Sequence, residues 1–184
     1  FWAGKRFYGR DDIHITDKYW RVFSGTGAGV QGLMNGNMDV AFVSGANYGP
    51  ADEDGGEVSN ATLDVRYRIQ KVGPGNLELE GALTMLPGNS DTNKSNADSG
   101  LQVAAIYGMN SFFNVASGFS KVAFQYGMDS AAGNVGDAQD GNNGKDGDAM
   151  YRLTAFGLAS VGESWQIMPA FVYEGKMPDQ GEDT

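Results

Sequence analysis

Charged and aromatic side chains are concentrated at residues 6–20, RFYGRDDIHITDKYW, which include the only histidine of the chain. Arginine and aspartate side chains can form hydrogen bonds to a polar ligand, and a pair of carboxylates can act as acid and base on a glycosidic bond. The stretch shows neither apolar residues at helical spacing nor the alternation of a strand, so we expect it to be a loop. Its function depends on the elements that hold it.

Hydrolysis is the first chemistry to weigh, because Asp11 and Asp12 lie beside aromatic residues. The two carboxylates of a glycoside hydrolase face each other at roughly 5–10 Å, whereas the side chains of adjacent residues tend to diverge. His14 has no evident nucleophile and no metal-ligand partners of other types in the sequence. We therefore expect neither a catalytic site nor a metal site.

Two other motifs point only weakly to ligands. GTGAGV at 25–30 is similar to the glycine turn of a dinucleotide site, but such a turn precedes a helix, and QGLMNGNMD follows it here. DAQDGNNGKDGD at 137–148 offers the oxygen atoms that calcium prefers, but it lacks the final glutamate of an EF-hand loop. We expect no cofactor, and a solvated loop at 137–148.

Composition excludes further classes of function. The 184 residues carry 13 Lys and Arg against 23 Asp and Glu, and the formal net charge of −10 argues against nucleic-acid binding. The chain has no cysteine, and no apolar run approaches the ~18 residues of a transmembrane helix. Because it starts without Met, at FWAGKRFY, we expect an internal fragment of a longer protein or, failing that, a processed chain.

Alternation of apolar and polar residues is the main structural signal. In LDVRYRIQKV (63–72) and LELEGALTML (77–86), apolar residues occupy alternate positions and charged residues lie between them. KVAFQYGMDS (121–130) and WQIMPAFVYEG (165–175) repeat the pattern. We count about nine such segments of about ten residues, roughly the length of a tilted strand that crosses a bilayer. The sequence predicts an all-β fold.

Short and long connections alternate along the chain. We expect short turns at 35–37, 73–76, 115–118 and 162–164, and long polar loops at 46–60, 87–98 and 131–148. An antiparallel up-and-down meander with its short turns at one end gives this order, as in outer-membrane barrels, whereas a Greek-key sandwich scatters its long crossovers. The stretch at 6–20 then lies at the end of the long loops, and 131–148 is an extracellular loop.

Periodicity alone does not separate a soluble barrel, whose apolar face points inward, from a membrane barrel, whose apolar face meets lipid. The charged positions Arg66, Glu80 and Arg152 favour the membrane barrel. A charge inside a dry core costs on the order of several kcal/mol unless it is paired, and a water-filled lumen removes that cost.

Phe119 follows the expected turn at 115–118. A turn aromatic commonly belongs to the belt at a membrane interface. It can equally face the lumen, where its ring stacks on the apolar side of a sugar. The local sequence leaves both positions open.

The stretch WAGKRFYGRDDIHITDKYW at 2–20, with SGTGAG at 24–29, resembles the maltoporin family of sugar-specific outer-membrane porins. The similarity continues through VRYRIQKVGPGNLELEGAL, GFSKVAFQYGMDS and MYRLTAFGLASVGESW. The resemblance implies that residues 1–184 are a partial porin domain, about half of an eighteen-stranded transmembrane β-barrel that assembles as a homotrimer in the bacterial outer membrane. Residues 9–24 would be a constriction loop folded into the lumen. The implied activity is diffusion of maltooligosaccharides or related sugars, not catalysis.

The resemblance also implies roles for single residues. Tyr19 matches the tyrosine that narrows the pore, and Phe119 matches an aromatic on which sugars slide, which favours the lumen for its ring. The polar residues of the constriction correspond to Arg10, Asp12, His14 and Asp17. Val22 stands where maltoporins carry an aspartate, so the preferred sugar stays open. The alternative is a soluble β-sandwich carbohydrate-binding module, which would use the same aromatics and carboxylates.

Overall fold

The computed structural model describes residues 1–8, 12–13, 18–19, 23–44, 61–88, 97–135 and 147–177, with the backbone alone at 6–8, 12–13, 18–19, 23–25 and 133–134. Its dominant element is a ten-stranded antiparallel sheet. The strands of this sheet are β1 (Trp2–Tyr8), β4 (Phe23–Gly32), β5 (Met38–Ser44), β6 (Ala61–Val72), β7 (Gly75–Met85), β8 (Ser99–Met109), β9 (Gly118–Asp129), β10 (Ala149–Val161), β11 (Trp165–Ile167) and β12 (Ala170–Met177).

Helical structure is limited to short turns in the described part of the chain. These are α1 (Leu33–Gly36) and α3 (Ala132–Val135), and α1 contains three residues with positive φ, Met34, Asn35 and Gly36. No helix of the described residues is long and apolar enough to cross a membrane. The predicted all-β class is confirmed.

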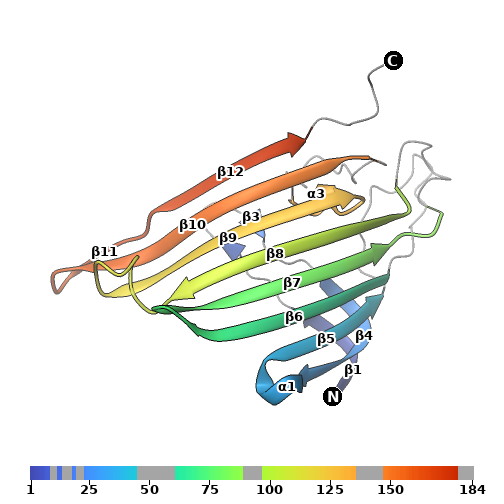
Figure 1. Cartoon of the computed structure of the whole chain (residues 1–184), viewed down its shortest axis with the longest axis horizontal. Helices are drawn as coiled ribbons and strands as arrows, with labels where there is room; N and C mark the ends of the chain where they lie inside the picture. The colour runs from blue at the N-terminus through green and yellow to red at the C-terminus, as the bar shows by residue number, and fades with distance from the viewer. Residues whose placement is uncertain are drawn as a thin grey trace.

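The sheet is an up-and-down meander. Each strand from β4 to β10 pairs with the strand before and after it, and β1 pairs with β4 (Figure 1). β11 and β12 both pair with β10 in one continuous register, so they are a single strand interrupted at Met168 and Pro169. Proline lacks the N–H that a ladder needs, which explains the interruption.

Connections alternate in length as predicted, with one difference. The tight ones lie at 33–37, 73–74 and 162–164, and the long ones at 9–22, 45–60, 86–98 and 130–148. Between β8 and β9, however, the connection covers residues 110–117, twice the four-residue turn expected at 115–118. Ser120 holds it in shape, because its Oγ accepts a hydrogen bond from the Phe113 N–H at 3.0 Å and donates one to the Ser111 carbonyl at 2.8 Å.

The two faces of the sheet differ in polarity, and the exposed one is apolar. The polar face carries Asp64, Arg66, Glu80, Gln125, Arg152 and Thr154, all buried. The apolar face carries Leu63, Leu79, Leu83, Phe124, Leu153 and Phe171, all exposed. Arg152 is 2% exposed, for example, whereas Phe124 is 45% exposed. A soluble protein buries such apolar side chains and leaves the charges in water, so this sheet is built for an apolar environment outside.

Strand length fits the same environment. The strands β6 to β10 contain 11 to 13 residues each. At about 3.3 Å per residue and a tilt of roughly 45°, such strands rise about 26–30 Å, which matches the apolar thickness of a membrane. The soluble β-sandwich alternative is therefore disfavoured.

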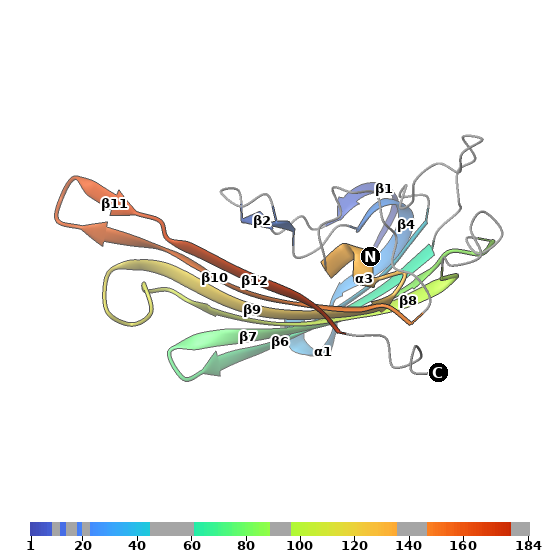
Figure 2. The same cartoon turned by 90° about the horizontal axis from the view of Figure 1, so that it is seen from above.

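The sheet curves around its polar face. Figure 2 shows the bent layer with β2 and α3 on its concave side. There, β2 (Asp12–Ile13) pairs with β3 (Lys18–Tyr19) apart from the large sheet. α3 packs on the polar face itself, since a Cβ added to Gly127 would lie 2.4 Å from the carbonyl oxygen of Ala131 and 2.8 Å from Val135 Cγ2.

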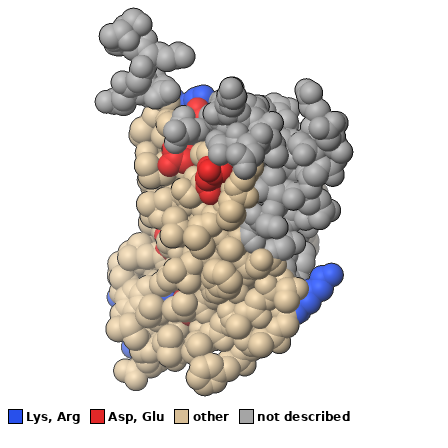
Figure 3. Space-filling model, turned by 90° about the vertical axis from the view of Figure 1, so that its right-hand side faces the viewer, with Lys and Arg blue, Asp and Glu red and all other residues tan. Residues whose placement is uncertain are grey.

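Charge is unevenly distributed at the end where the long connections lie. Figure 3 views this end, with acidic side chains gathered close to the grey residues and a largely uncharged described surface below them. This distribution fits a sheet with a polar rim and an apolar belt.

Candidate functional site

A row of side chains, polar at every strand but β8, crosses the polar face, with one residue from each strand in register. From β5 to β12 the row reads Asp39, Arg66, Glu80, Ala104, Gln125, Arg152 and Glu174. The strand alternation places these residues on one face, and the pairing of the strands aligns them. Acidic and basic residues alternate along much of this row, which keeps the polar face close to neutral.

Ion pairs hold the charged side chains in fixed positions. The Arg68 guanidinium contacts Asp39 Oδ2 at 2.5 Å through Nη2 and Glu78 Oε2 at 3.1 Å through Nε. Arg152 Nε lies 2.5 Å from Glu174 Oε1. Burying an arginine is costly unless a carboxylate compensates its charge. These ion pairs therefore allow several charged side chains to lie close together on the polar face.

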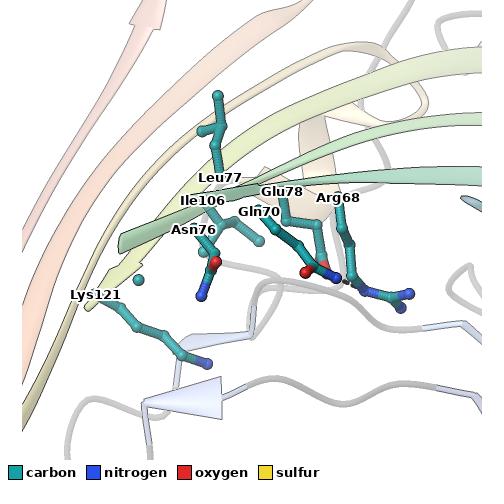
Figure 4. Close-up of a pocket in the computed structure, with 8 residues that line it drawn as sticks. Arg68, Gln70, Asn76, Leu77, Glu78, Ile106 and Lys121 are labelled. Atoms are coloured by element: carbon teal, nitrogen blue, oxygen red, sulfur yellow. Dashed lines mark hydrogen bonds and ion pairs between the residues drawn. The ribbon is translucent and has the colours of Figure 1, made fainter. Parts of the chain in front are cut away.

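Beside Arg68 the polar face is hollowed by a cavity of about 350 Å³. Its lining residues come from β6, β7, β8 and β9 and are Arg68, Gln70, Asn76, Leu77, Glu78, Ile106, Gly108 and Lys121. Figure 4 shows Gln70 beside the Arg68–Glu78 pair, with Asn76 and Lys121 at the other end of the hollow. Cations, an anion and two amides therefore converge there, a set that can donate hydrogen bonds to a ligand and accept them from it.

The structure brings together some of the residues predicted to form the site. Asp12 of β2 stands opposite Tyr19 of β3 in the register of the small pair. Phe119, near the start of β9, lies on the same face of the sheet as Lys121 two residues later, and the residue is 36% exposed. Arg10, His14 and Asp17 lie outside the described residues, as do Val22 and Asp11.

The sequence analysis missed several residues on this face. Phe156 of β10 lies edge-on to Phe119, with ring centroids 5.9 Å apart and ring planes at 82°. The sequence could have revealed Phe156, because it lies at an alternate position with Arg152 and Thr154 on β10, where a polar side chain is expected and an aromatic one stands out. Lys121 and Asn76 carried no signal beyond their phase, since only the strand register places them at one hollow.

No group of three or more His, Cys, Asp or Glu side chains in the described part of the chain is arranged to hold a metal ion. The acidic tract at 137–148 falls mostly outside the described residues, so the calcium hypothesis for that tract stays open.

Comparison with known proteins decides the family. The model of the LamB porin family matches residues 1–184. A maltoporin of Photobacterium profundum is 31% identical to the chain over 99% of its length, and a maltoporin of Vibrio cholerae is 31% identical over 94%. The chain belongs to the LamB porin family.

Membership in the LamB porin family confirms the predicted class. Porins of this family are β-barrels of the bacterial outer membrane, and they are channels rather than enzymes. The ten-stranded sheet, with its exposed apolar face, is a segment of such a barrel. The chain covers 43% and 41% of the length of the two maltoporins, so it spans less than half of the curated relatives it matches.

Proposed function

We propose that the protein containing this chain is an outer-membrane channel for the diffusion of maltose, maltooligosaccharides or related sugars. The observation that carries the proposal is the inverted sheet, which turns apolar side chains outward and ion-paired charges toward its concave side in a chain of the LamB porin family. The polar face then lines a water-filled lumen, and lipid covers the apolar face. The name of the two relatives, maltoporin, supports a sugar as the solute.

The constriction of this channel is formed by residues 9–24. The pair β2–β3 lies on the concave side of the sheet, where an inward-folded loop belongs (Figure 2). In the proposed arrangement Tyr19 narrows the pore, and Arg10, Asp12, His14 and Asp17 exchange hydrogen bonds with sugar hydroxyls. Residues 131–148 are an extracellular loop. The complete barrel has eighteen strands and forms a homotrimer.

The chemistry of the lining suits a sugar in transit. A pyranose has apolar faces and a rim of hydroxyl groups, so an aromatic such as Phe119 can stack on the ring while charged groups bind the rim. Transport requires several weak sites from which the sugar can leave, rather than one deep pocket. The preferred sugar depends on the constriction, where Val22 replaces the aspartate of maltoporins.

Three substitutions test the channel and the constriction together. Tyr19→Ala is expected to raise the single-channel current in planar bilayers, because a bulky ring leaves the narrowest point. Arg10→Ala is expected to weaken the block of this current by maltotriose by about 1–3 kcal/mol, through loss of a charged hydrogen bond. Phe119→Ala is expected to weaken the same block by about 1 kcal/mol through lost stacking.

Phe124→Ala is the control for Phe119, because it removes an aromatic from the apolar face of the same strand. It should leave both current and block unchanged. Current and sugar block that stay at wild-type values in all three test variants would place residues 9–24 outside the pore. Titrating the wild-type channel with sucrose as well as maltotriose determines the sugar preference.

A further inference from the structure

The connection between β8 and β9 folds back onto the apolar face of the sheet. Residues 110–117 form the curl at the left-hand end of β9 in Figure 2. Phe112 lies against β10 there, because a Cβ added to Gly157 would lie 2.9 Å from Phe112 Cδ2. Gly157 alternates in phase with Leu153, which is exposed on the apolar face. The connection therefore covers part of the face that we assign to lipid.

Ser120 of β9 holds the connection on this face. It shares the strand phase of Phe124, which is 45% exposed, yet Ser120 itself is fully buried. The Ser120 Oγ accepts a hydrogen bond from the Phe113 N–H at 3.0 Å and donates one to the Ser111 carbonyl at 2.8 Å. Both strands of the hairpin wall, β9 and β10, thus contact the folded-back connection.

The fold-back carries Phe112 inside the rim of the sheet. Gly157, which Phe112 covers, lies four positions before the end of β10 at Val161. At about 3.3 Å per residue and a tilt of roughly 45°, Phe112 is about 9 Å from that end, measured along the barrel axis. The polar layer of a bilayer is roughly 5–8 Å thick on each side. A connection in water would project beyond the strands, whereas this one reaches the level of the upper acyl chains.

The surface that the connection presents is uncharged and largely apolar. Residues 110–117, NSFFNVAS, contain no charged side chain, and Val115 at the tip is 80% exposed. The neighbouring residues of β10 and β11 on the same face, all exposed, are Val161, Trp165 and Ile167. Tryptophan is enriched where a protein crosses the membrane–water interface. This surface is continuous with the apolar face and shares its preference for lipid.

The backbone of the connection is held in an unfavourable conformation. Phe113 and Asn114 have φ values of 46° and 61°, in the left-handed region that a bulky residue such as phenylalanine rarely adopts. The Phe113 ring meets the Phe112 ring edge to face, with centroids 5.0 Å apart. Backbone strain of this kind recurs at positions where a function requires a particular geometry. Here it keeps two aromatic rings together on the outer side of the sheet.

We propose that residues 110–117 are a membrane anchor. Phe112, Phe113 and Val115 insert between the headgroups and the upper acyl chains of the phospholipid leaflet at this end of the barrel, and Ser120 keeps them there. The occupant is lipid because the anchor is uncharged and continuous with the lipid-facing side of β9 and β10. The inference rests on the proposed function, since it requires the apolar face to lie in a membrane.

A fluorescent label on a single cysteine tests the anchor in the complete protein, made free of other cysteines and reconstituted in phosphatidylcholine vesicles. Val115→Cys carries the label at the exposed tip of the connection. Glu163→Cys is the matched control, because it lies in the tight connection that joins β10 to β11. Phe124→Cys places the label on the apolar face of β9 as the reference for lipid.

Two quenchers report the surroundings of each label. A lipid with a nitroxide high on its acyl chain is expected to quench the Val115 label at least about twofold more than the Glu163 label, because the tip lies at the headgroup–acyl boundary. Iodide in the water is expected to quench the Val115 label at least about twofold less than the Glu163 label, for the same reason.

Ser120→Ala tests how the connection is held. It removes both hydrogen bonds of the Ser120 hydroxyl, so the Val115 label is expected to lose lipid quenching and gain iodide quenching. Ser160→Ala is its control, because it removes an exposed hydroxyl from the neighbouring strand and should leave both values unchanged. An unchanged Val115 label in Ser120→Ala would overturn the role of Ser120.

The outcomes separate the anchor from the proposed function. If the lipid nitroxide does not quench the Phe124 label, the apolar face is not in lipid and the proposed function fails. If it quenches the Phe124 label while the Val115 label responds like the Glu163 label, the connection lies in water and the anchor is overturned. A Val115 label that neither quencher reaches would show that another protein chain covers the connection, which also overturns the anchor.

Discussion

Replacing Leu79 with arginine is expected to lower the free energy of unfolding of the barrel in lipid vesicles by about 2–4 kcal/mol. Leu79 lies near the middle of β7, on the apolar face, and is 40% exposed. In a membrane that exposed surface meets hydrocarbon, where an arginine at mid-depth loses its hydration. The measurement is denaturant unfolding of the reconstituted barrel, followed by tryptophan fluorescence.

Leu79→Met is the control at the same position, because it keeps an apolar side chain of similar size and should change the unfolding free energy by less than about 1.5 kcal/mol. The opposite environment gives a clearly different result. On a water-exposed surface, Leu79→Arg would stay within about 0.5 kcal/mol of wild type. That outcome would contradict the assignment of the apolar face to lipid.

Strand alternation made the two faces predictable from sequence. Successive side chains in a strand point to opposite sides, so Leu79 and Glu80 had to lie on different faces wherever the strand went. Alternation could not show which face points outward, because the sequence pattern of an apolar face is the same whether that face packs inward or meets lipid. The exposure of Leu79 and the burial of Glu80 show that the apolar face is the outer one.

The length of the connection at 110–117 could not be predicted from the local sequence. Gly118 suggested a turn, and it opens β9 with a φ of 141° that favours glycine. Phe112 and Phe113 are residue types typical of strands, yet they lie in the connection, where their rings meet edge to face with centroids 5.0 Å apart and planes at 82°. The Ser120 hydroxyl produces this shape, because it accepts a hydrogen bond from the Phe113 N–H and donates one to the Ser111 carbonyl, seven and nine positions earlier. Such contacts leave no short-range pattern in the sequence.

The sequence predicted which types of residue lie on the polar face, but not which of them contact one another. Arg68 lies two positions after Arg66 and so on the same face of its strand, but its partner Asp39 is 29 residues away, and only the register of β5 and β6 brings the two together. The same holds for Lys121 and Phe156, which face each other across β9 and β10. The roles of Tyr19, Arg10 and the other loop residues come from family resemblance and stay predictions.

Truncation of Arg152 to alanine is expected to be among the most costly changes on the polar face, lowering the unfolding free energy by about 2–4 kcal/mol. The Arg152 side chain is 2% exposed and its Nε lies 2.5 Å from Glu174 Oε1, in register across β10 and β12. Removing the cation leaves the Glu174 carboxylate, which is 22% exposed, without that partner. The free-energy cost of this uncompensated charge is larger than the net stabilisation that the intact ion pair provides.

A double-mutant cycle isolates this coupling. Arg152→Ala with Glu174→Ala should cost less than the sum of the two single changes, with a coupling of about 0.5–3 kcal/mol, because the double variant leaves no uncompensated charge of the pair. Lys176→Ala is the control on the same strand: it breaks the contact with Asp148, but Lys176 is 57% exposed and water already screens its charge. The loss there should stay below about 1 kcal/mol. An equal decrease in unfolding free energy for Arg152→Ala and Lys176→Ala would contradict this prediction. It would mean that water screens both ion pairs equally, so that Arg152 is as accessible to water as Lys176.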